Sequence, residues 1–308
     1  MTPAPTRPGA GPAPGAPTVR QAVAGAALVL AEAGVPSPDV DARLLAEHVL
    51  GRSLFRVPAT ATFADLAAPG EEASLQARYA GLVDRRRRRE PLQHITGEMA
   101  FRYLLLEAAP GAFIVRPETE TVAQVAVDAA AAGARAGRAP VVVDLCTGSG
   151  AIALAVATEV PAAHVHAVEI SPDAHLVAAR NVARLAPRVH LVLGDAATAL
   201  PELDGTVDVV VSNPPYIPPD AVPREVEVRE HDPDLALYGG GADGLDVPRA
   251  VMAAAARLLA PGGLFVMEHA EVQADAARRA AAAAGLVEVT TGRDLSGRDR
   301  YVTARRPG

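Results

Sequence analysis

One stretch constrains the fold more than any other, and it runs from Val141 to Leu154 as VVVDLCTGSGAIAL. Its β-branched run predicts a buried strand, its glycines a turn, and the apolar residues after Gly150 a helix. Gly148 and Gly150 let the backbone approach a ligand closely, because they carry no side chain. Strand, glycine-rich turn and helix in this order indicate the first unit of a dinucleotide-type α/β domain.

Strands and helices alternate through the rest of the chain. Further strands are expected at residues 164–169, 189–193, 207–212 and 264–268, the last after a turn at 261–263, with a closing hairpin of 285–290 and 300–304. Such alternation indicates parallel strands joined by helices that cover both faces of a sheet. We therefore predict an α/β domain with a doubly wound, mostly parallel sheet of seven strands.

Acidic residues follow two of these strands. Glu169 ends the strand at 164–169, about 25 residues after Asp144, where dinucleotide-type domains place a carboxylate that accepts hydrogen bonds from ribose hydroxyls. Asp195 follows the next strand, at the position that faces the base of the ligand in such folds. The glycine turn and Glu169 together predict a nucleoside-containing ligand more strongly than either feature alone.

The strand at 207–212 runs into Asn213-Pro214-Pro215-Tyr216. Each proline lacks a backbone donor, so the loop presents mostly acceptors at the end of a buried strand. A planar NH2 group fits it, because the two hydrogens can point at the Asn213 side-chain oxygen and the Pro214 carbonyl while Tyr216 stacks on its face. The loop predicts an amide or an exocyclic base amine as substrate, with an ordinary strand-exit turn as the alternative.

The N-terminal third predicts a tail followed by helices. Residues 1–17 are rich in proline, alanine and glycine, which predicts disorder. Helices are expected over 19–33 with Thr18 as cap, from Ser37-Pro38 to Gly51, and over 71–89. The third ends in five arginines, Arg85 to Arg89, which suit a solvated helix end and could also grip an acidic partner.

The region between these helices and the glycine turn predicts a linker. Residues 90–97 break the helical pattern, and 101–106 with 112–115 predict a hairpin around Pro110-Gly111. Arg116-Pro117-Glu118-Thr119-Glu120 then opens a helix, with proline at its first position and acids in its first turn. We expect a helical substrate-recognition domain over 18–94, a hairpin linker over 95–116 and a catalytic domain over 117–308. His48 and His94 are interpreted as packing or structural residues.

Composition excludes several classes of protein. Half of the 308 residues are apolar, so the chain is not a disordered protein. The net charge of -7 and the lack of a broad basic segment weigh against duplex nucleic acid as the main partner. Cys146 is the single cysteine, which excludes an intramolecular disulfide, and no His/Cys cluster has metal-ligand spacing. Because no apolar run is long enough for a bilayer and no signal peptide is evident, we expect a cytoplasmic protein.

With the glycine turn, Glu169 and Asn213 to Tyr216 in this order, the chain resembles class I S-adenosylmethionine-dependent methyltransferases. It is most similar to the HemK or PrmC family, the glutamine methyltransferases of peptide chain release factors. The closer resemblance covers residues 18–306 and rests on Glu90 to Gly97, Arg116 to Glu120, Asn213 to Ile217, and Leu235 to Leu237 leading to Asp243 to Asp246.

The resemblance implies roles for individual residues. S-adenosylmethionine would be held by Asp144, Thr147, Gly148, Ser149, Gly150, Ala151, Glu169, Asp195, Ala196 and Asn213. The glutamine of the Gly-Gly-Gln motif of release factors would be held by Asn213, Pro214, Pro215 and Tyr216, of which Asn213, Pro214 and Tyr216 would act in catalysis. Cys146 stands where the family's loop often has glycine, and we expect it in a β conformation.

Catalysis by positioning is expected, because no side chain here is a strong enough base to deprotonate an amide nitrogen. Three alternatives remain open: an adenine amino-methyltransferase that uses the same loop on a flipped nucleic-acid base, a methyltransferase for a glutamine in another translation protein, and a non-catalytic cofactor-binding scaffold. The expected partners are release factors, with no metal, no membrane and no stable nucleic-acid partner. The expected state is a monomer.

Overall fold

The computed structural model describes residues 15–70 and 72–308, so most of the predicted tail lies outside the described residues. The chain forms two compact units, Met1–Thr96 and Gly97–Gly308. Each unit has its own hydrophobic core. Among the described residues, no helix is both long enough and apolar enough to cross a membrane.

The first unit is helical. Its elements are α1 (Val19–Glu32), α2 (Pro38–Leu50), η1 (Leu54–Arg56), α3 (Phe63–Leu66), α4 (Glu72–Arg87) and α5 (Leu92–Thr96). Thr18 caps α1 through a reciprocal capping box with Gln21, and Gly51 ends α2 in the left-handed conformation, as the sequence predicts. The sequence predicts a break in the helical pattern at 90–97, whereas the structure forms α5 there.

The arginine run at the end of α4 is bound within this unit. Arg86 is buried, and its Nε donates to Oδ2 of the buried Asp41 over 2.7 Å. Its neighbours pair with nearby acids: Arg85 with Glu90, and both Arg87 and Arg88 with Asp84. The prediction of a solvated helix end is wrong for Arg86, because the buried carboxylate of Asp41 requires a cation beside it.

The second unit begins with a hairpin of β1 (Glu98–Phe101) and β2 (Leu104–Glu107), which turns at Arg102 and Tyr103. The chain turns at Pro110-Gly111 as predicted, but no hairpin forms around this turn, and the predicted strand at 112–115 is wrong. Arg102 has a φ of 51°, a conformation that no sequence pattern predicts for arginine. Remote contacts hold it there, because its guanidinium pairs with Glu159 over 2.6 Å and its backbone N–H donates to Glu120.

A seven-stranded sheet of order β5-β4-β3-β6-β7-β9-β8 forms the centre of the second unit. Its strands are β3 (Val141–Leu145), β4 (His164–Glu169), β5 (His190–Leu193), β6 (Val207–Ser212), β7 (Leu259–Glu268), β8 (Val287–Arg293) and β9 (Asp299–Arg305). The first five in spatial order run parallel, and β9 is antiparallel to both neighbours. The predicted doubly wound, mostly parallel sheet is confirmed. Strand β7 begins before the predicted turn at 261–263, because Leu259 already pairs with Val207 ahead of a register shift.

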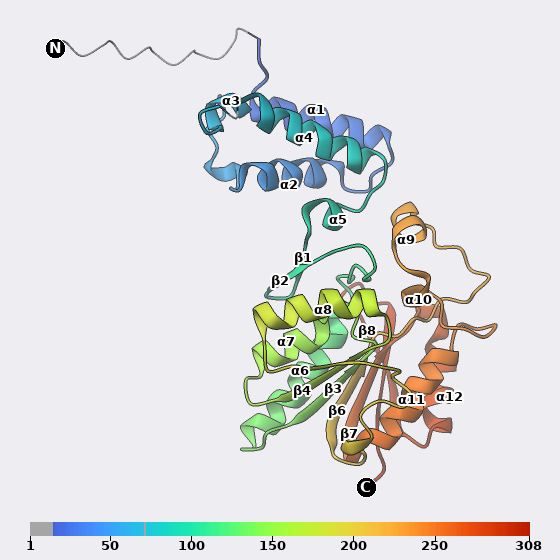
Figure 1. The fold of residues 1–308 in the computed structure, drawn as a ribbon. Helices are drawn as coiled ribbons and strands as arrows, with labels where there is room; N and C mark the ends of the chain where they lie inside the picture. The colour runs from blue at the N-terminus through green and yellow to red at the C-terminus, as the bar shows by residue number, and fades with distance from the viewer. Residues whose placement is uncertain (1–14, 71) are drawn as a thin grey trace, which may run out of the picture. The chain divides into compact units, whose positions relative to one another are not determined.

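Helices cover both faces of the sheet (Figure 1). One face packs against α6 (Thr119–Arg135), α7 (Ala151–Glu159) and α8 (Pro172–Leu185), and the other against α11 (Asp246–Leu258) and α12 (Ala274–Ala283). Val142 packs with the first group and Val143 with the second, as alternation along a strand requires. Helix α6 begins two residues later than predicted, with Glu118 as its N-cap. The connections contain η2 (Pro201–Leu203), α9 (Val226–His231), α10 (Asp234–Leu237) and η3 (Glu271–Gln273).

The strand order reverses between β3 and β6, which are neighbours in the sheet although two strands separate them in the sequence. In open parallel sheets a crevice forms at such a point, beyond the carboxyl ends of the strands. The glycine turn follows β3 and Asn213 follows β6. The fold therefore brings the two predicted motifs to one crevice.

Candidate active site

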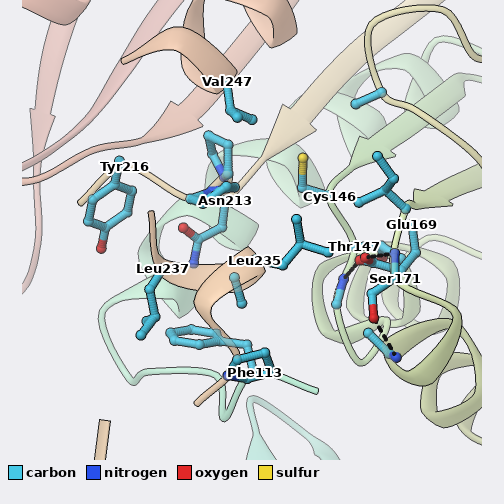
Figure 2. A pocket seen from close by; sticks show the side chains of 18 of the residues that line it. Phe113, Cys146, Thr147, Glu169, Ser171, Asn213, Tyr216, Leu235, Leu237 and Val247 are labelled. Carbon is cyan, nitrogen blue, oxygen red and sulfur yellow. Dashed lines mark hydrogen bonds between the residues drawn. The ribbon is translucent and has the colours of Figure 1, made fainter. Parts of the chain in front are cut away.

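A cavity of about 760 Å³ lies at this crevice. Among the predicted site residues, it is lined by Thr147, Gly148, Ser149, Ala151, Glu169, Asp195, Ala196, Asn213, Pro214, Pro215 and Tyr216. Asp144 and Gly150 do not line it. Figure 2 shows Thr147 and Glu169 on one side of the cavity and Asn213 and Tyr216 on the other. One cavity thus contains all of the predicted substrate residues and all of the predicted cofactor residues except Asp144 and Gly150.

The glycine turn joins β3 to α7 and contains two left-handed glycines, Gly148 with a φ of 57° and Gly150 with a φ of 87°. A Cβ on Gly148, which lines the cavity, would meet nothing within 4 Å. A Cβ on Gly150 would meet Leu154 Cδ1 at 3.3 Å. Gly148 therefore leaves room for a ligand, whereas Gly150 serves the backbone turn and the packing of α7, which differs from the ligand contact predicted for it.

Asp144 holds the glycine turn from within the protein. Its Oδ2 accepts hydrogen bonds from Thr147 Oγ1 at 2.6 Å and from Ala153 N at 3.0 Å. The side chain is fully buried, and burial raises its pKa to about 7. Asp144 therefore organises the turn and the start of α7, and it does not face the cavity as a cofactor ligand would.

Glu169 ends β4 beside the turn. Its Oε2 accepts a hydrogen bond from Gly148 N and its Oε1 accepts one from Ser171 N, both at 2.8 Å. Burial raises its pKa, and these backbone donors oppose the shift. Each carboxylate oxygen keeps a second lone pair for a hydroxyl donor. Asp195, after β5, is exposed and accepts a hydrogen bond from Ala197 N at 2.9 Å.

Cys146 has a φ of 61°, so the β conformation predicted for it is wrong. The chain turns sharply here, because the next residue, Thr147, donates its N–H to Val168 O at 2.9 Å. A left-handed residue other than glycine costs about 1 to 2 kcal/mol. Burial raises the pKa of the thiol, so the side chain stays uncharged.

The loop after β6 presents the Asn213 side chain in one orientation. Asn213 Nδ2 donates to Thr119 Oγ1 at 3.2 Å, so the side-chain oxygen remains an acceptor. Pro214 is buried and Pro215 lines the cavity, and neither contributes a backbone donor. The Tyr216 hydroxyl donates to a carboxylate oxygen of Glu268 at 3.2 Å. The ring of Tyr216, rather than its hydroxyl, is therefore available to a substrate.

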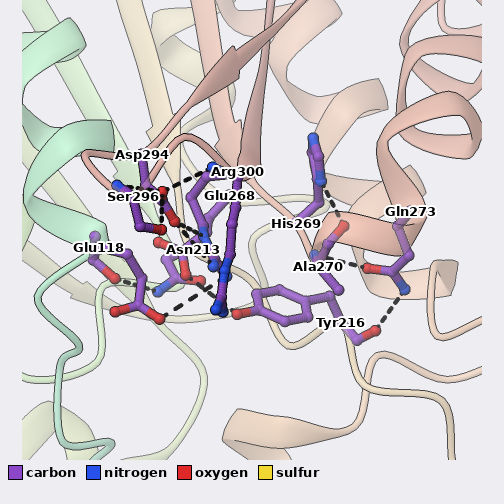
Figure 3. Close-up of polar contacts among 12 residues, drawn as sticks. Glu118, Asn213, Tyr216, Glu268, His269, Ala270, Gln273, Asp294, Ser296 and Arg300 are labelled. Atoms are coloured by element: carbon purple, nitrogen blue, oxygen red, sulfur yellow. Dashed lines mark hydrogen bonds and ion pairs between the residues drawn. The ribbon is translucent and has the colours of Figure 1, made fainter.

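Residues from far along the chain support the backbone of this loop. Gln273 Nε2 donates to Tyr216 O at 2.8 Å (Figure 3). A Cβ on Gly239 would collide with Gly244 O and come within 2.6 Å of Pro215 O, and one on Gly244 would collide with Tyr216 O. Both glycines therefore lie directly on the loop, and a side chain at either position would displace it.

Phe113 and Arg116 form part of another wall of the cavity. The Arg116 guanidinium carbon lies 4.8 Å from the centroid of the Phe113 ring, which is a cation–π contact. Arg116 also pairs with the buried carboxylate of Asp232 over 2.5 Å. These contacts anchor the segment before α10 to the segment before α6.

Two protein families match the chain. Residues 21–97 match the PrmC N-terminal domain, and residues 142–231 match a methyltransferase domain. A release factor glutamine methyltransferase from Streptomyces coelicolor is 48% identical over 92% of this chain and 96% of its own length. One from Bifidobacterium longum is 45% identical over 89% of this chain and 95% of its own length.

The chain belongs to the release factor glutamine methyltransferase family. The resemblance drawn from the sequence motifs is therefore confirmed. Among solved structures, a methyltransferase from Pyrococcus furiosus is 18% identical, with a TM-score of 0.47, and the match covers 66% of this chain and 89% of that one.

Sequence reasoning missed several residues that shape the site of this family member. They are Phe113, Thr119, Gly239, Gly244, Glu268 and Gln273. The resemblance marked the stretches around Thr119 and Gly244, but no local pattern indicated what these residues contact. Periodicity describes which way a side chain faces within its own element, and these contacts join different elements.

Proposed function

We propose that this protein transfers a methyl group from S-adenosylmethionine to the side-chain amide nitrogen of the glutamine in the Gly-Gly-Gln motif of peptide chain release factors. One observation carries the proposal beyond family membership. Asn213 donates its NH2 to Thr119 and so keeps its oxygen as an acceptor, within the same cavity as Gly148 and Glu169. An acceptor of this kind suits a substrate that donates through an NH2 group.

The residues on the β3–β5 side of the cavity fit the cofactor. Gly148 leaves open space where a side chain would stand, Glu169 keeps lone pairs for the ribose hydroxyls, and Asp195 lies exposed beyond β5. Thr147, Ser149, Ala151 and Ala196 complete this part of the lining. When bound, the cofactor supplies a methyl group that the sulfonium charge makes reactive.

The residues on the other side would orient the glutamine amide. The Asn213 oxygen and the Pro214 carbonyl accept its two N–H groups, and the Tyr216 ring stacks on its plane. Such placement favours a pyramidal nitrogen with its lone pair directed at the methyl group, so no base has to remove a proton before transfer. After the nitrogen has accepted the methyl group, it would release one of its two protons to water. Near-attack positioning of this kind is worth several kcal/mol.

The charge of the cavity favours a protein substrate over a nucleic acid. Its charged lining residues are Arg116 and the acids Glu118, Glu169, Asp195, Glu225 and Asp246. An acidic lining repels the phosphates that flank a flipped base. The arginine run, which could have gripped an acidic partner such as a nucleic acid, has internal partners at Arg85 to Arg88. We further propose that the enzyme acts as a monomer in the cytoplasm, without a stable nucleic-acid partner.

The test uses the full chain, S-adenosylmethionine and a purified release factor. We expect the release factor to gain one methyl group by mass spectrometry. Its Gln→Asn variant should gain almost none, because the side chain is one methylene too short to reach. Asn213→Ala should lower turnover about a hundredfold, as removal of one preorganised polar group does. Labelling of DNA or RNA with no labelling of the release factor would promote the adenine alternative in place of this proposal.

A further inference from the structure

Glu268 carries a buried carboxyl group next to the substrate loop, which is the segment from Asn213 to Tyr216 (Figure 3). It ends β7 with 1% of its surface exposed. Its Oε1 accepts the Tyr216 hydroxyl at 3.2 Å, and its Oε2 is buried with no hydrogen-bond partner among the described residues. The Thr119 hydroxyl lies beside the carboxyl group and lowers its pKa as a hydrogen-bonding neighbour. Glu268 is thus hydrogen-bonded to Tyr216, and its unpartnered Oε2 is available to the hydroxyl of the neighbouring Thr119.

The direction of these hydrogen bonds determines which end of the Asn213 amide faces the cavity. Asn213 Nδ2 donates to Thr119 Oγ1, so the single hydroxyl hydrogen of Thr119 must point elsewhere. An ionised carboxylate only accepts hydrogen bonds, and Glu268 offers Thr119 such an acceptor. With Glu268 accepting, Thr119 accepts from Asn213, and the Asn213 oxygen is left for the substrate.

We propose that Glu268 is a positioning residue that acts through Thr119 and Tyr216 to hold the Asn213 side-chain oxygen toward the substrate nitrogen. This inference rests on the proposed function and deepens it. The carboxylate touches no reacting atom. Loss of its acceptor character lets Thr119 donate to Asn213 instead, which would turn the Asn213 NH2 group toward the NH2 group of the substrate.

The surroundings of Glu268 make this arrangement sensitive to pH. Burial raises its pKa to about 7, against the lowering effects of Thr119, Arg300 and Tyr216. The charged groups around it are Arg300, which pairs with Asp294 over 3.1 Å, and Glu118, which lies 3.9 Å from Arg300. The ionised, accepting form prevails above about pH 7, so activity should fall as the pH falls through that value. Stability moves the other way, because a carboxyl group with a raised folded-state pKa favours the fold at low pH and loses that contribution as the pH rises.

The first measurement compares the wild type with Glu268→Gln on a release factor. The two side chains have the same shape, but the amide can donate to Thr119 where the carboxylate only accepts. We expect kcat to fall about tenfold or more, while the KM for S-adenosylmethionine stays unchanged. The fall in activity below about pH 7 that we expect in the wild type should be absent from the pH–rate profile of the variant. Glu271→Gln is the same change at an exposed position three residues further along the chain. It should leave kcat and the pH dependence of activity as they are in the wild type.

A double-mutant cycle provides the second measurement. Thr119→Val keeps the shape of the side chain and removes the hydroxyl, whereas Thr119→Ser keeps the hydroxyl and should retain activity. If Glu268 acts through Thr119, the double variant Thr119→Val with Glu268→Gln should be no slower than the slower single variant. The inference would be overturned if the loss of kcat in the double variant equalled the product of the two single losses. It would also be overturned if the activity of Glu268→Gln still fell below about pH 7, because that titration would then belong to another group such as Asp144. An inactive wild type would instead refute the proposed function.

Discussion

The proposed cofactor side of the cavity, which follows β3 to β5, and its proposed substrate side, which follows β6, are built in different ways. On the cofactor side, Asp144 binds Thr147 three residues away, and Glu169 binds Gly148 at a separation of 21 residues. On the substrate side, Asn213 binds Thr119 across 94 residues and Tyr216 binds Glu268 across 52. Short-range contacts form within one β-α-β unit, whereas the others require the whole sheet. The substrate side should therefore be the more sensitive to changes at remote positions.

The largest expected loss of activity comes from a substitution on the substrate side, at a position outside the motif Asn213 to Tyr216. In Gly239→Ala, the new Cβ would collide with Gly244 O and lie within 2.6 Å of Pro215 O, so it would displace both backbone segments. A misplacement of about 1 Å can cost about a hundredfold in rate, and we expect at least that loss with cofactor affinity retained. Enzyme kinetics and calorimetry provide the two readings. Gly25→Ala, where a Cβ meets nothing within 4 Å, is the matched control, and equal rates for both variants would contradict the comparison.

An intermediate effect is expected on the cofactor side. Glu169→Ala removes the acceptor for ribose hydroxyls and leaves Gly148 N and Ser171 N without their partner. Affinity for S-adenosylmethionine should weaken by about 1 to 3 kcal/mol in calorimetry, while kcat at saturating cofactor changes less. Glu202→Ala, at an exposed glutamate of the same unit, should bind as the wild type does. If Glu169→Ala bound S-adenosylmethionine with unchanged affinity, Glu169 would not be a cofactor-binding residue.

The smallest expected effect concerns Cys146, whose φ of 61° disfavours a β-branched side chain. Relative to the wild type, Cys146→Gly should change the free energy of unfolding by no more than about 1 kcal/mol, because relief of strain offsets the extra freedom of the unfolded chain. Cys146→Val should be less stable than Cys146→Gly by about 1 to 2 kcal/mol. Denaturant unfolding measures both, and a valine variant at least as stable as the glycine variant would show that the position tolerates a β conformation.

Features that depend on neighbours in the chain were predictable. The strands at 164–169 and 207–212 match β4 and β6, because apolar β-branched runs that end at a turn signal have few other conformations available. Thr18 and Gly51 mark helix ends by capping chemistry, which acts within one turn. The hairpin turn was misplaced, because no local pattern marks the positive φ of Arg102, whose partners Glu159 and Glu120 lie far along the chain.

The sequence by itself determined that this chain forms a doubly wound sheet with a glycine turn after one strand and a proline-rich loop, Asn213 to Tyr216, after another. The spacing of apolar residues, the turn residues and the geometry of proline are local properties, so they can be recognised from consecutive residues. The tertiary structure alone decided that Asp144 faces inward, that Gly239 lies against the loop of Asn213 to Tyr216, and that the Tyr216 hydroxyl donates to Glu268. Such contacts depend on strand order and on how helices pack across the sheet, because the packed sheet brings together residues that are dozens of positions apart in the chain.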